Sequence, residues 1–97
     1  MHVSVTRVNT GEEPIANASV VAEEMMRWFR QSEGFEGMLF LSRPGTTLAL
    51  TFWESREVAD RQRVSRMQFR DRMTAAAGAE VEETVDYTVT FAQFPRE

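Results

Sequence analysis

The order of hydrophobic patterns along this 97-residue chain predicts an α+β fold with the element order β-α-β-β-α-β. Three observations lead to it. Apolar and polar residues alternate near both ends of the chain, apolar residues recur every three or four positions in two intervening segments, and two apolar runs flank a Pro-Gly turn in the middle. The length suits one domain, because domains usually hold about 100–150 residues. We therefore expect residues 1–97 to form a single domain.

The first half of the chain predicts a strand, a helix and a second strand. Val3, Val5 and Val8 give a short β-favouring stretch that ends near Asn9. From about Ile15 the apolar period lengthens to three and four, which is typical of an amphipathic helix; its inward positions are Ala18, Val21, Met25 and Trp28. Gly34 suits the left-handed residue that ends such a helix, and residues 35–41 then form a nearly continuous apolar strand.

The second half predicts a hairpin partner, a broken helix and a last strand. Pro44 and Gly45 fit the central positions of a type II turn, so residues 47–53 return as a strand. Ser55 is a suitable N-cap for a helical stretch that Gly78 ends. Its apolar residues do not fall on one stripe of a continuous helix, which predicts a break near Ser65. Residues 81–91 alternate with a period of two, apart from Glu83 on the apolar side, and predict a long strand.

This order corresponds to a ferredoxin-like fold, in which a four-stranded antiparallel sheet carries both helices on one face. The central hairpin is apolar on both of its faces, although the helices cover only one. We expect the second face to be an interface, because large exposed apolar patches usually mark one. The sequence thus predicts a homodimer in which two sheets stack. The residues assigned to the second face are Leu39, Leu41, Ala49 and Trp53, with Trp53 at the dimer interface or the hairpin edge.

Composition excludes several kinds of chemistry. The chain has no Cys, which removes disulfides, thiolate metal sites and a thiol nucleophile. All eleven basic residues are Arg, so no lysine can form a Schiff base. The net charge of −4 argues against a nucleic-acid partner. No apolar run reaches the roughly 18 residues that span a bilayer, and the first residues lack a secretion signal, so we expect a cytoplasmic protein without a membrane segment.

Residues 51–57, Thr-Phe-Trp-Glu-Ser-Arg-Glu, followed by Gln62, Ser65 and Phe69, resemble the strand-to-helix region of the antibiotic biosynthesis monooxygenase (ABM) family. Residues 34–37, Gly-Phe-Glu-Gly, are similar to the loop before the family's second strand. The resemblance covers most of the chain and implies a dimeric α+β barrel. It also implies cofactor-free oxygenation of polyketide-type phenols to quinones, or haem degradation as in one branch of the family.

The positions that matter for these activities differ here. Many members of the family place a His where this chain has Gln62. In the haem-degrading branch an Asn on the first strand matches Asn9, but the expected Trp falls near Gln62 and the expected His falls near Arg72. A haem enzyme needs a proximal ligand. The only His in the chain is His2, at a terminus expected to fray, so haem degradation is disfavoured and no cofactor or metal is expected.

Two groups of residues are candidates for a site. Asn9, Gln62 and Arg66 are polar side chains that would hold a phenolate or a peroxide intermediate, although none of them is a general base of tunable pKa. The predicted pocket between helices and sheet would accept a flat aromatic ligand, and the same residues would equally make a closed core. These are Met25, Trp28, Phe40, Phe52, Phe69 and Tyr87, the last expected to be a buried phenol.

Other charged residues carry less weight. The second helical segment is rich in Arg, and we interpret that set as a solvated face from which only Arg66 reaches inward. Two hypotheses remain open. The chain is a cofactor-independent monooxygenase for a small aromatic compound, or it is a dimeric domain that binds a small molecule or regulates another protein without catalysis.

Overall fold

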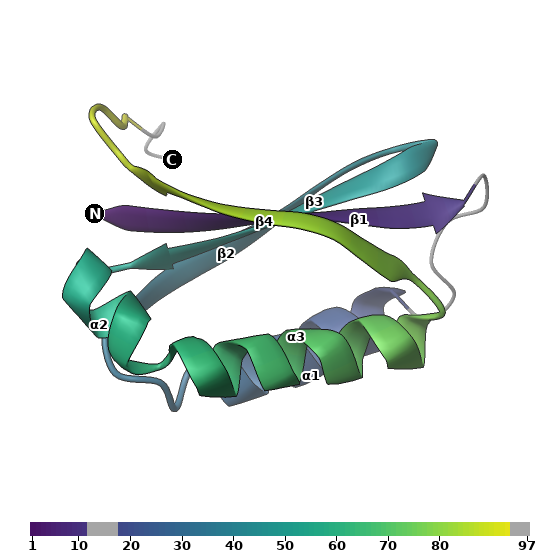
Figure 1. Cartoon of the computed structure of the whole chain (residues 1–97), viewed down its shortest axis with the longest axis horizontal. Helices are drawn as coiled ribbons and strands as arrows, with labels where there is room; N and C mark the ends of the chain where they lie inside the picture. The colour runs from purple at the N-terminus through teal and green to yellow at the C-terminus, as the bar shows by residue number, and fades with distance from the viewer. Residues whose placement is uncertain (12–17, 94–97) are drawn as a thin grey trace.

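The computed structural model describes residues 1–11 and 18–93. In chain order the elements are β1 (His2–Gly11), α1 (Ala18–Phe29), β2 (Phe35–Arg43), β3 (Gly45–Trp53), α2 (Arg56–Arg61), α3 (Arg63–Ala77) and β4 (Glu80–Thr88). The four strands form one sheet in the order β2-β3-β1-β4, and each neighbouring pair is antiparallel. All three helices lie on one side of this sheet (Figure 1). This confirms the ferredoxin-like α+β fold.

Local sequence signals explain most of the element ends. Gly34, Gly45 and Gly78 have φ values of 74°, 87° and 70°, so the two predicted helix ends and the predicted Pro-Gly turn are confirmed. The Ser55 side chain accepts a hydrogen bond from the Val58 N–H and caps α2. The predicted helix start at Ile15 lies outside the described residues.

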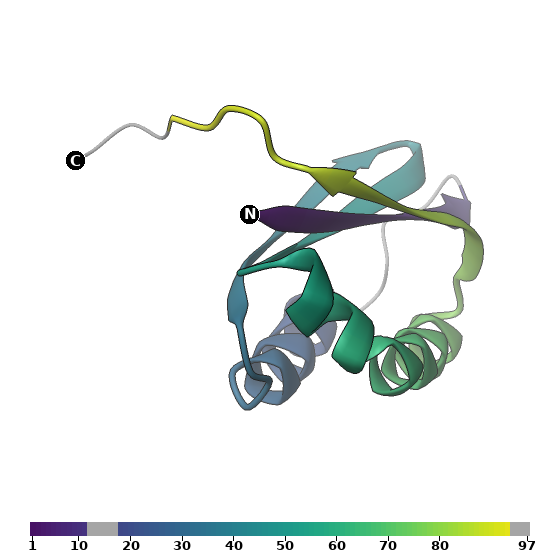
Figure 2. The same cartoon turned by 60° about the vertical axis from the view of Figure 1, so that its left-hand side comes forward.

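Two predicted boundaries were wrong. The break in the second helical segment falls at Gln62, between α2 and α3, rather than near Ser65. The last strand ends at Thr88 rather than Phe91, because Thr88 pairs with His2 and β1 begins there. Beyond it Val89 still donates to the Met1 carbonyl at 2.9 Å, and the chain then leaves the sheet on the side away from the helices (Figure 2).

The register of the hairpin corrects the predicted faces of the sheet. The two-residue turn pairs Arg43 with Thr46, which places Phe40 opposite Ala49 and Leu41 opposite Leu48. Residues that pair across strands share a face. Ala49 and Trp53 therefore face the helices together with Met38 and Phe40, and they are not part of the second apolar face. The open face instead carries Val3, Val5, Leu39, Leu41, Leu48, Leu50, Phe52, Val85 and Tyr87.

The core lies at one end of the space between sheet and helices. Trp53 is fully buried and makes edge-to-face contacts with Phe29 and Phe35, whose ring centres lie 5.9 and 5.6 Å away. The expected interface position of Trp53 was thus wrong. Its indole N–H donates to the Thr51 hydroxyl at 3.0 Å, so the buried donor is satisfied within the chain.

The face of the sheet beneath the helices is unusually polar. Along β1 and β3 it presents four buried hydroxyl side chains, Ser4, Thr6, Thr47 and Thr51. The apolar open face and this hydroxyl-bearing covered face invert the usual arrangement of a sheet with one solvated side. In the part of the chain that the structure describes, no helix is long and apolar enough to cross a membrane.

Candidate active site

The predicted pocket under the helices is narrow where the described residues line it. Two voids lined by these residues measure about 40 and 60 Å³. Met25 and Phe69 line the first, and Met25 and Phe40 line the second. A cavity that accepts a benzene-sized ring measures about 150 Å³. An aromatic ligand would therefore enter this space only if the surrounding side chains moved.

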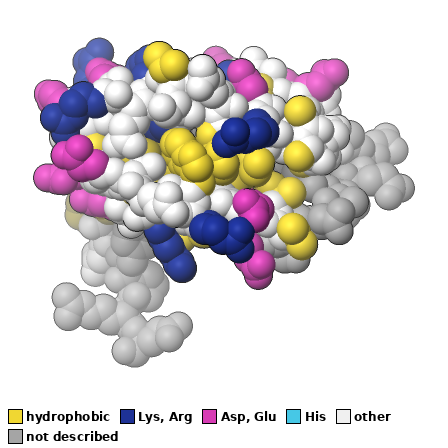
Figure 3. Space-filling model, turned by 90° about the horizontal axis from the view of Figure 1, so that it is seen from below, with side chains coloured by type: hydrophobic (Ala, Val, Ile, Leu, Met, Phe, Trp, Pro, Cys, Tyr) yellow, Lys and Arg dark blue, Asp and Glu magenta, His cyan; other side chains and the backbone are white. Residues whose placement is uncertain are grey.

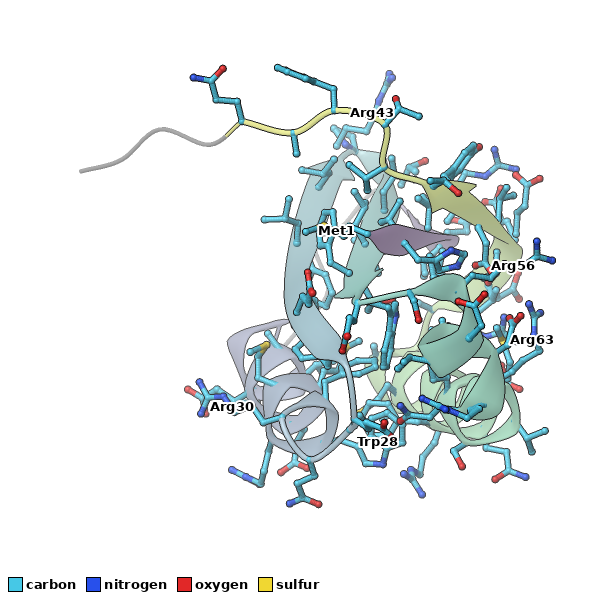
Figure 4. All side chains as sticks on the ribbon, turned by 90° about the vertical axis from the view of Figure 1, so that its left-hand side faces the viewer. Met1, Trp28, Arg30, Arg43, Arg56 and Arg63 are labelled. Carbon is cyan, nitrogen blue, oxygen red and sulfur yellow. The ribbon has the colours of Figure 1, made fainter. Side chains whose placement is uncertain are left out.

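Trp28 packs on Phe69, one of the residues that line the first void. Its ring stacks on Phe69 with the centres 4.4 Å apart and the planes 10° from parallel, and it meets Phe29 edge-on. Figure 4 shows Trp28 between α1 and the α2–α3 segment, and Figure 3 shows a band of apolar side chains between charged ones on the same side of the molecule.

Phe52 and Tyr87 lie elsewhere than the sequence predicted. Both pair with Val3, on the open face, so the sheet separates them from Trp28 and Phe69. Tyr87 is 54% exposed rather than a buried phenol. Their placement in one pocket with Trp28 was wrong, because the register of the strands turns them to the other side.

Arg66 points inward as the sequence predicted. It is only 5% exposed, its Nε donates to the Ala59 carbonyl at 3.1 Å, and its guanidinium lies over Trp53, 5.2 Å from the ring centre. Burial lowers the pKa of the Arg66 guanidinium below its ordinary value, and Asp86 acts in the opposite direction. The Nη2 atom of Arg66 is buried without a hydrogen-bond partner. Arg66 thus holds a donor available for a ligand.

The other two predicted catalytic residues are not near one another. Gln62 sits at the junction of α2 and α3, where its side-chain amide donates to the Glu33 carbonyl at 2.6 Å. Asn9 is exposed and pairs with Thr46, on the open face. Trp53 lies beneath Arg66, at the other end of β3 from Thr46. At about 3.3 Å per residue, Thr46 and Trp53 are about 23 Å apart along the strand. One chain therefore does not bring Asn9 together with Arg66.

A larger cleft lies beside the narrow interior, between β4 and the α2–α3 segment. Its volume is about 680 Å³, within the range of small-molecule sites. Figure 4 shows Arg56 and Arg63 on the β4 side of the molecule, with Arg30 on the opposite side. Met67 and Arg70 line both this cleft and the first interior void, so the two spaces share a wall. The residues that line it are His2, Arg56, Arg63, Met67, Arg70, Thr84, Val85, Asp86, Tyr87 and Thr88.

His2 is the residue that sequence reasoning dismissed. It lies inside the sheet: β1 runs between β3 and β4, and His2 pairs with Trp53 on one side and Thr88 on the other. The side chain is 5% exposed, and its Nε2 lies 3.4 Å from Asp86 Oδ2. The even spacing of His2, Ser4 and Thr6 on the covered face was the signal that would have placed it beneath the helices.

Comparison with known proteins finds similarity at the level of structure. No protein-family profile matches the chain, and no curated protein sequence matches it. The chain has a ferredoxin-like α+β fold. Solved structures that share this fold over nearly the whole chain include antibiotic biosynthesis monooxygenases.

Three of these structures define the likeness. A Deinococcus radiodurans protein provisionally named an antibiotic biosynthesis monooxygenase has 18% identity, a TM-score of 0.70 and full coverage of both chains. SnoaB, a cofactor-independent oxygenase from Streptomyces nogalater, has 16% identity and a TM-score of 0.66, with 94% of this chain and 95% of SnoaB covered. The ActVA-Orf6 monooxygenase of Streptomyces coelicolor, in complex with nanaomycin D, has 15% identity and a TM-score of 0.66, with 98% and 92% covered.

Proposed function

We propose that this chain is a cofactor-independent monooxygenase that oxidises a small, polyketide-like aromatic compound. The observation that carries the proposal is the full-length likeness to ABM-type structures, among them a cofactor-independent oxygenase and a monooxygenase holding a ligand. A buried arginine with an unsatisfied donor, Arg66, supports it, because such a group stabilises an anionic intermediate.

The chemistry requires no bound cofactor. An electron-rich phenolate gives its electrons to O₂, one oxygen atom enters the substrate as the new quinone carbonyl, and the other leaves as water. A CH₂ group that becomes a carbonyl supplies all the electrons that O₂ accepts. The protein then contributes position and electrostatics, for which we propose Arg66, with Gln62 at the neighbouring helix junction. We propose that Met25, Trp28, Phe40 and Phe69 contact the ring once the surrounding side chains move.

Oxygen consumption with an anthrone-type substrate tests the proposal. We expect uptake of one O₂ per quinone formed, without added metal, flavin or haem. Arg66→Met should lower the rate by at least about tenfold. Because the substitution also removes the hydrogen bond to the Ala59 carbonyl, circular dichroism is used to establish that the variant is folded before its rate is compared. Arg27→Met, on the exposed side of α1, is the matched control and should leave the rate unchanged. Absence of uptake with any substrate of this class would refute the function.

We also propose that the chain is a homodimer in which two open faces stack. The open face of β1 to β4 is apolar, and its exposed members include Leu39, Leu41 and Tyr87 at 44%, 50% and 54%. A patch of this kind usually marks an interface. In this arrangement Asn9 lies at the edge of the interface rather than at the oxygenation site.

A second candidate function follows from the narrow interior. The voids of about 40 and 60 Å³ fit a packed core better than a substrate pocket. On this view the chain is a dimeric domain that binds a ligand or another protein without catalysis. Ligand binding without oxygen uptake would favour it over the monooxygenase.

A further inference from the structure

The unsatisfied buried polar atoms of this protein gather in one place. Within residues 1–11 and 18–93, the buried side-chain atoms without a hydrogen-bond partner are His2 Nδ1 and Nε2, Asp86 Oδ1 and Arg66 Nη2. Buried polar groups are nearly always paired, so each exception calls for an explanation. Here three side chains, from β1, β4 and α3, have buried polar atoms without a hydrogen-bond partner. Two of them, His2 and Asp86, line the cleft.

His2 and Asp86 form a pair on the covered face of the sheet. His2 Nε2 lies 3.4 Å from Asp86 Oδ2, close enough for a charge contact but not aligned as a hydrogen bond. Arg63 donates to the same Oδ2 at 3.3 Å and holds the carboxylate in place. A carboxylate beside an imidazole stabilises the protonated ring and leaves its other nitrogen to accept a proton.

The charged groups around His2 come from every element that packs there. Arg56 and Asp60 belong to α2, Arg63, Arg66 and Arg70 to α3, and Asp86 to β4. Asp60 contacts Arg56 at 3.6 Å and Arg63 at 3.2 Å, and Arg63 also contacts Asp86 at 3.3 Å. Arg70 forms a separate pair with Asp71 at 2.8 Å. Three arginines and one aspartate line the cleft itself, so with a neutral His2 its lining carries an excess of two positive charges.

We propose that this cleft binds an aromatic compound through a hydroxyl group, and that His2, held by Asp86, accepts the hydroxyl proton. The O–H bond breaks, its electron pair stays on oxygen, and a new N–H bond forms on the imidazole. The bordering arginines then hold the phenolate. This inference rests on the proposed monooxygenase function, for which it supplies the base that the sequence lacked. It places substrate ionisation in the cleft beside β4, which shares Met67 and Arg70 with the interior where the oxygenation is proposed.

A hydroxyl ligand fits the cleft better than a permanent anion such as a carboxylate. A neutral hydroxyl can donate to the unpaired Oδ1 of Asp86 or to His2, which a carboxylate cannot do. The positive charge of the lining then suits the negative charge that forms on the hydroxyl oxygen. Met67 of α3 supplies apolar surface for the ring.

Access to His2 depends on side chains rather than on the backbone. The ring nitrogens are buried, but Arg56 and Arg63 border the cleft with side chains that are 77% and 53% exposed. Exposed side chains change rotamer on the picosecond-to-nanosecond timescale. A ligand therefore reaches the imidazole of His2 when the side chains of Arg56 and Arg63 change rotamer and turn toward the ligand.

The test uses 4-nitrophenol, whose visible absorbance reports ionisation directly. We expect the full-length protein to raise the acid constant of the bound phenol about tenfold over that of the free phenol, and His2→Gln to return it to the free value. Asp86→Asn should lose most of the effect. Arg63→Ala should weaken binding, whereas Arg27→Ala, an exposed arginine of α1, should not. Because His2 is the only histidine, its imidazole NMR signals should shift on addition of the phenol.

Each outcome decides between the two proposals. Unchanged His2 signals, or an ionisation shift that survives in His2→Gln, would overturn the assignment of His2 even if oxygen uptake is normal. An ionisation shift lost in His2→Gln, with no oxygen uptake by any variant, would keep the site and refute the monooxygenase. Should His2→Gln fail to fold, the NMR signals of the unmodified protein and the Arg63→Ala variant carry the same decision.

Discussion

Substitution of Gly34 by Ala tests whether the loop between α1 and β2 fixes the position of the α2 segment. Gly34 has a φ of 74°, which an L-residue adopts at a cost of about 1–2 kcal/mol. A Cβ built on Gly34 would also collide with the Cγ1 atom of Val58, a buried residue of α2. Overpacking of this kind costs about 1–3 kcal/mol. We expect Gly34→Ala to lose about 2–5 kcal/mol of unfolding free energy.

Gly78 provides a matched control. Its φ of 70° carries the same backbone penalty, but a Cβ there would meet nothing within 4 Å. Gly78→Ala should therefore lose only about 1–2 kcal/mol. Any gain from a stiffer unfolded chain is common to both variants and cancels in the comparison. For a domain of this size each kcal/mol lowers the melting temperature by about 4–8 °C, so Gly34→Ala should melt on the order of 10 °C below Gly78→Ala.

Thermal unfolding followed by circular dichroism measures the difference. Val58→Ala removes the methyl groups that collide, so the double variant Gly34→Ala with Val58→Ala should lose less than the sum of the two single variants. Equal melting temperatures for Gly34→Ala and Gly78→Ala, or strictly additive losses in the double variant, would show that the contact with Val58 does not decide the cost.

Three further changes have defined outcomes. Thr51→Val removes the acceptor of the buried Trp53 indole and should cost about 1–3 kcal/mol in denaturant unfolding, whereas Thr88→Val at the exposed end of β4 should cost little. The hydrogen bond from Arg63 lowers the pKa of Asp60 below its ordinary value, so ionised Asp60 stabilises the fold above that ordinary pKa. In this range Asp60→Asn should melt at a lower temperature than the unmodified protein. The difference in melting temperature should vanish as the pH falls through the lowered pKa. Leu41→Glu on the open face should give a monomer in sedimentation, while Val64→Glu, 70% exposed on α3, should leave the dimer intact.

Local signals in the sequence were sufficient for the element order. The positive φ at Gly34, Gly45 and Gly78 and the Ser55 cap are properties of single residues, and the structure confirms them. The predicted faces of the sheet were wrong because alternation within one strand separates its two faces. It does not show which of these faces lies on the same side as a given face of the neighbouring strand. The two-residue turn at Pro44 and Gly45 settles that question, since it pairs Phe40 with Ala49.

The candidate site was harder to predict because it depends on contacts between distant parts of the chain. Arg66 was predicted from its position next to an apolar stripe, and it is buried over Trp53. His2 was discounted because it lies near the start of the chain, although strand pairing on both sides buries it. Its partner Asp86 is eighty-four positions further along, and only the sheet order brings β1 and β4 together.

The uneven placement of the aromatic residues has a consequence for motion. Phe29, Trp53 and Phe69 hold the helices on the sheet at the α2 end, whereas small residues, Ala77 and Ala79, contribute to the lining of the void at the other end. Small side chains bury less apolar surface, so local opening costs less free energy there. We expect amide hydrogens to exchange fastest at the C-terminal end of α3 and progressively more slowly toward Phe69. The helical layer would then separate from the sheet first at the C-terminal end of α3, while the aromatic cluster keeps the other end in place.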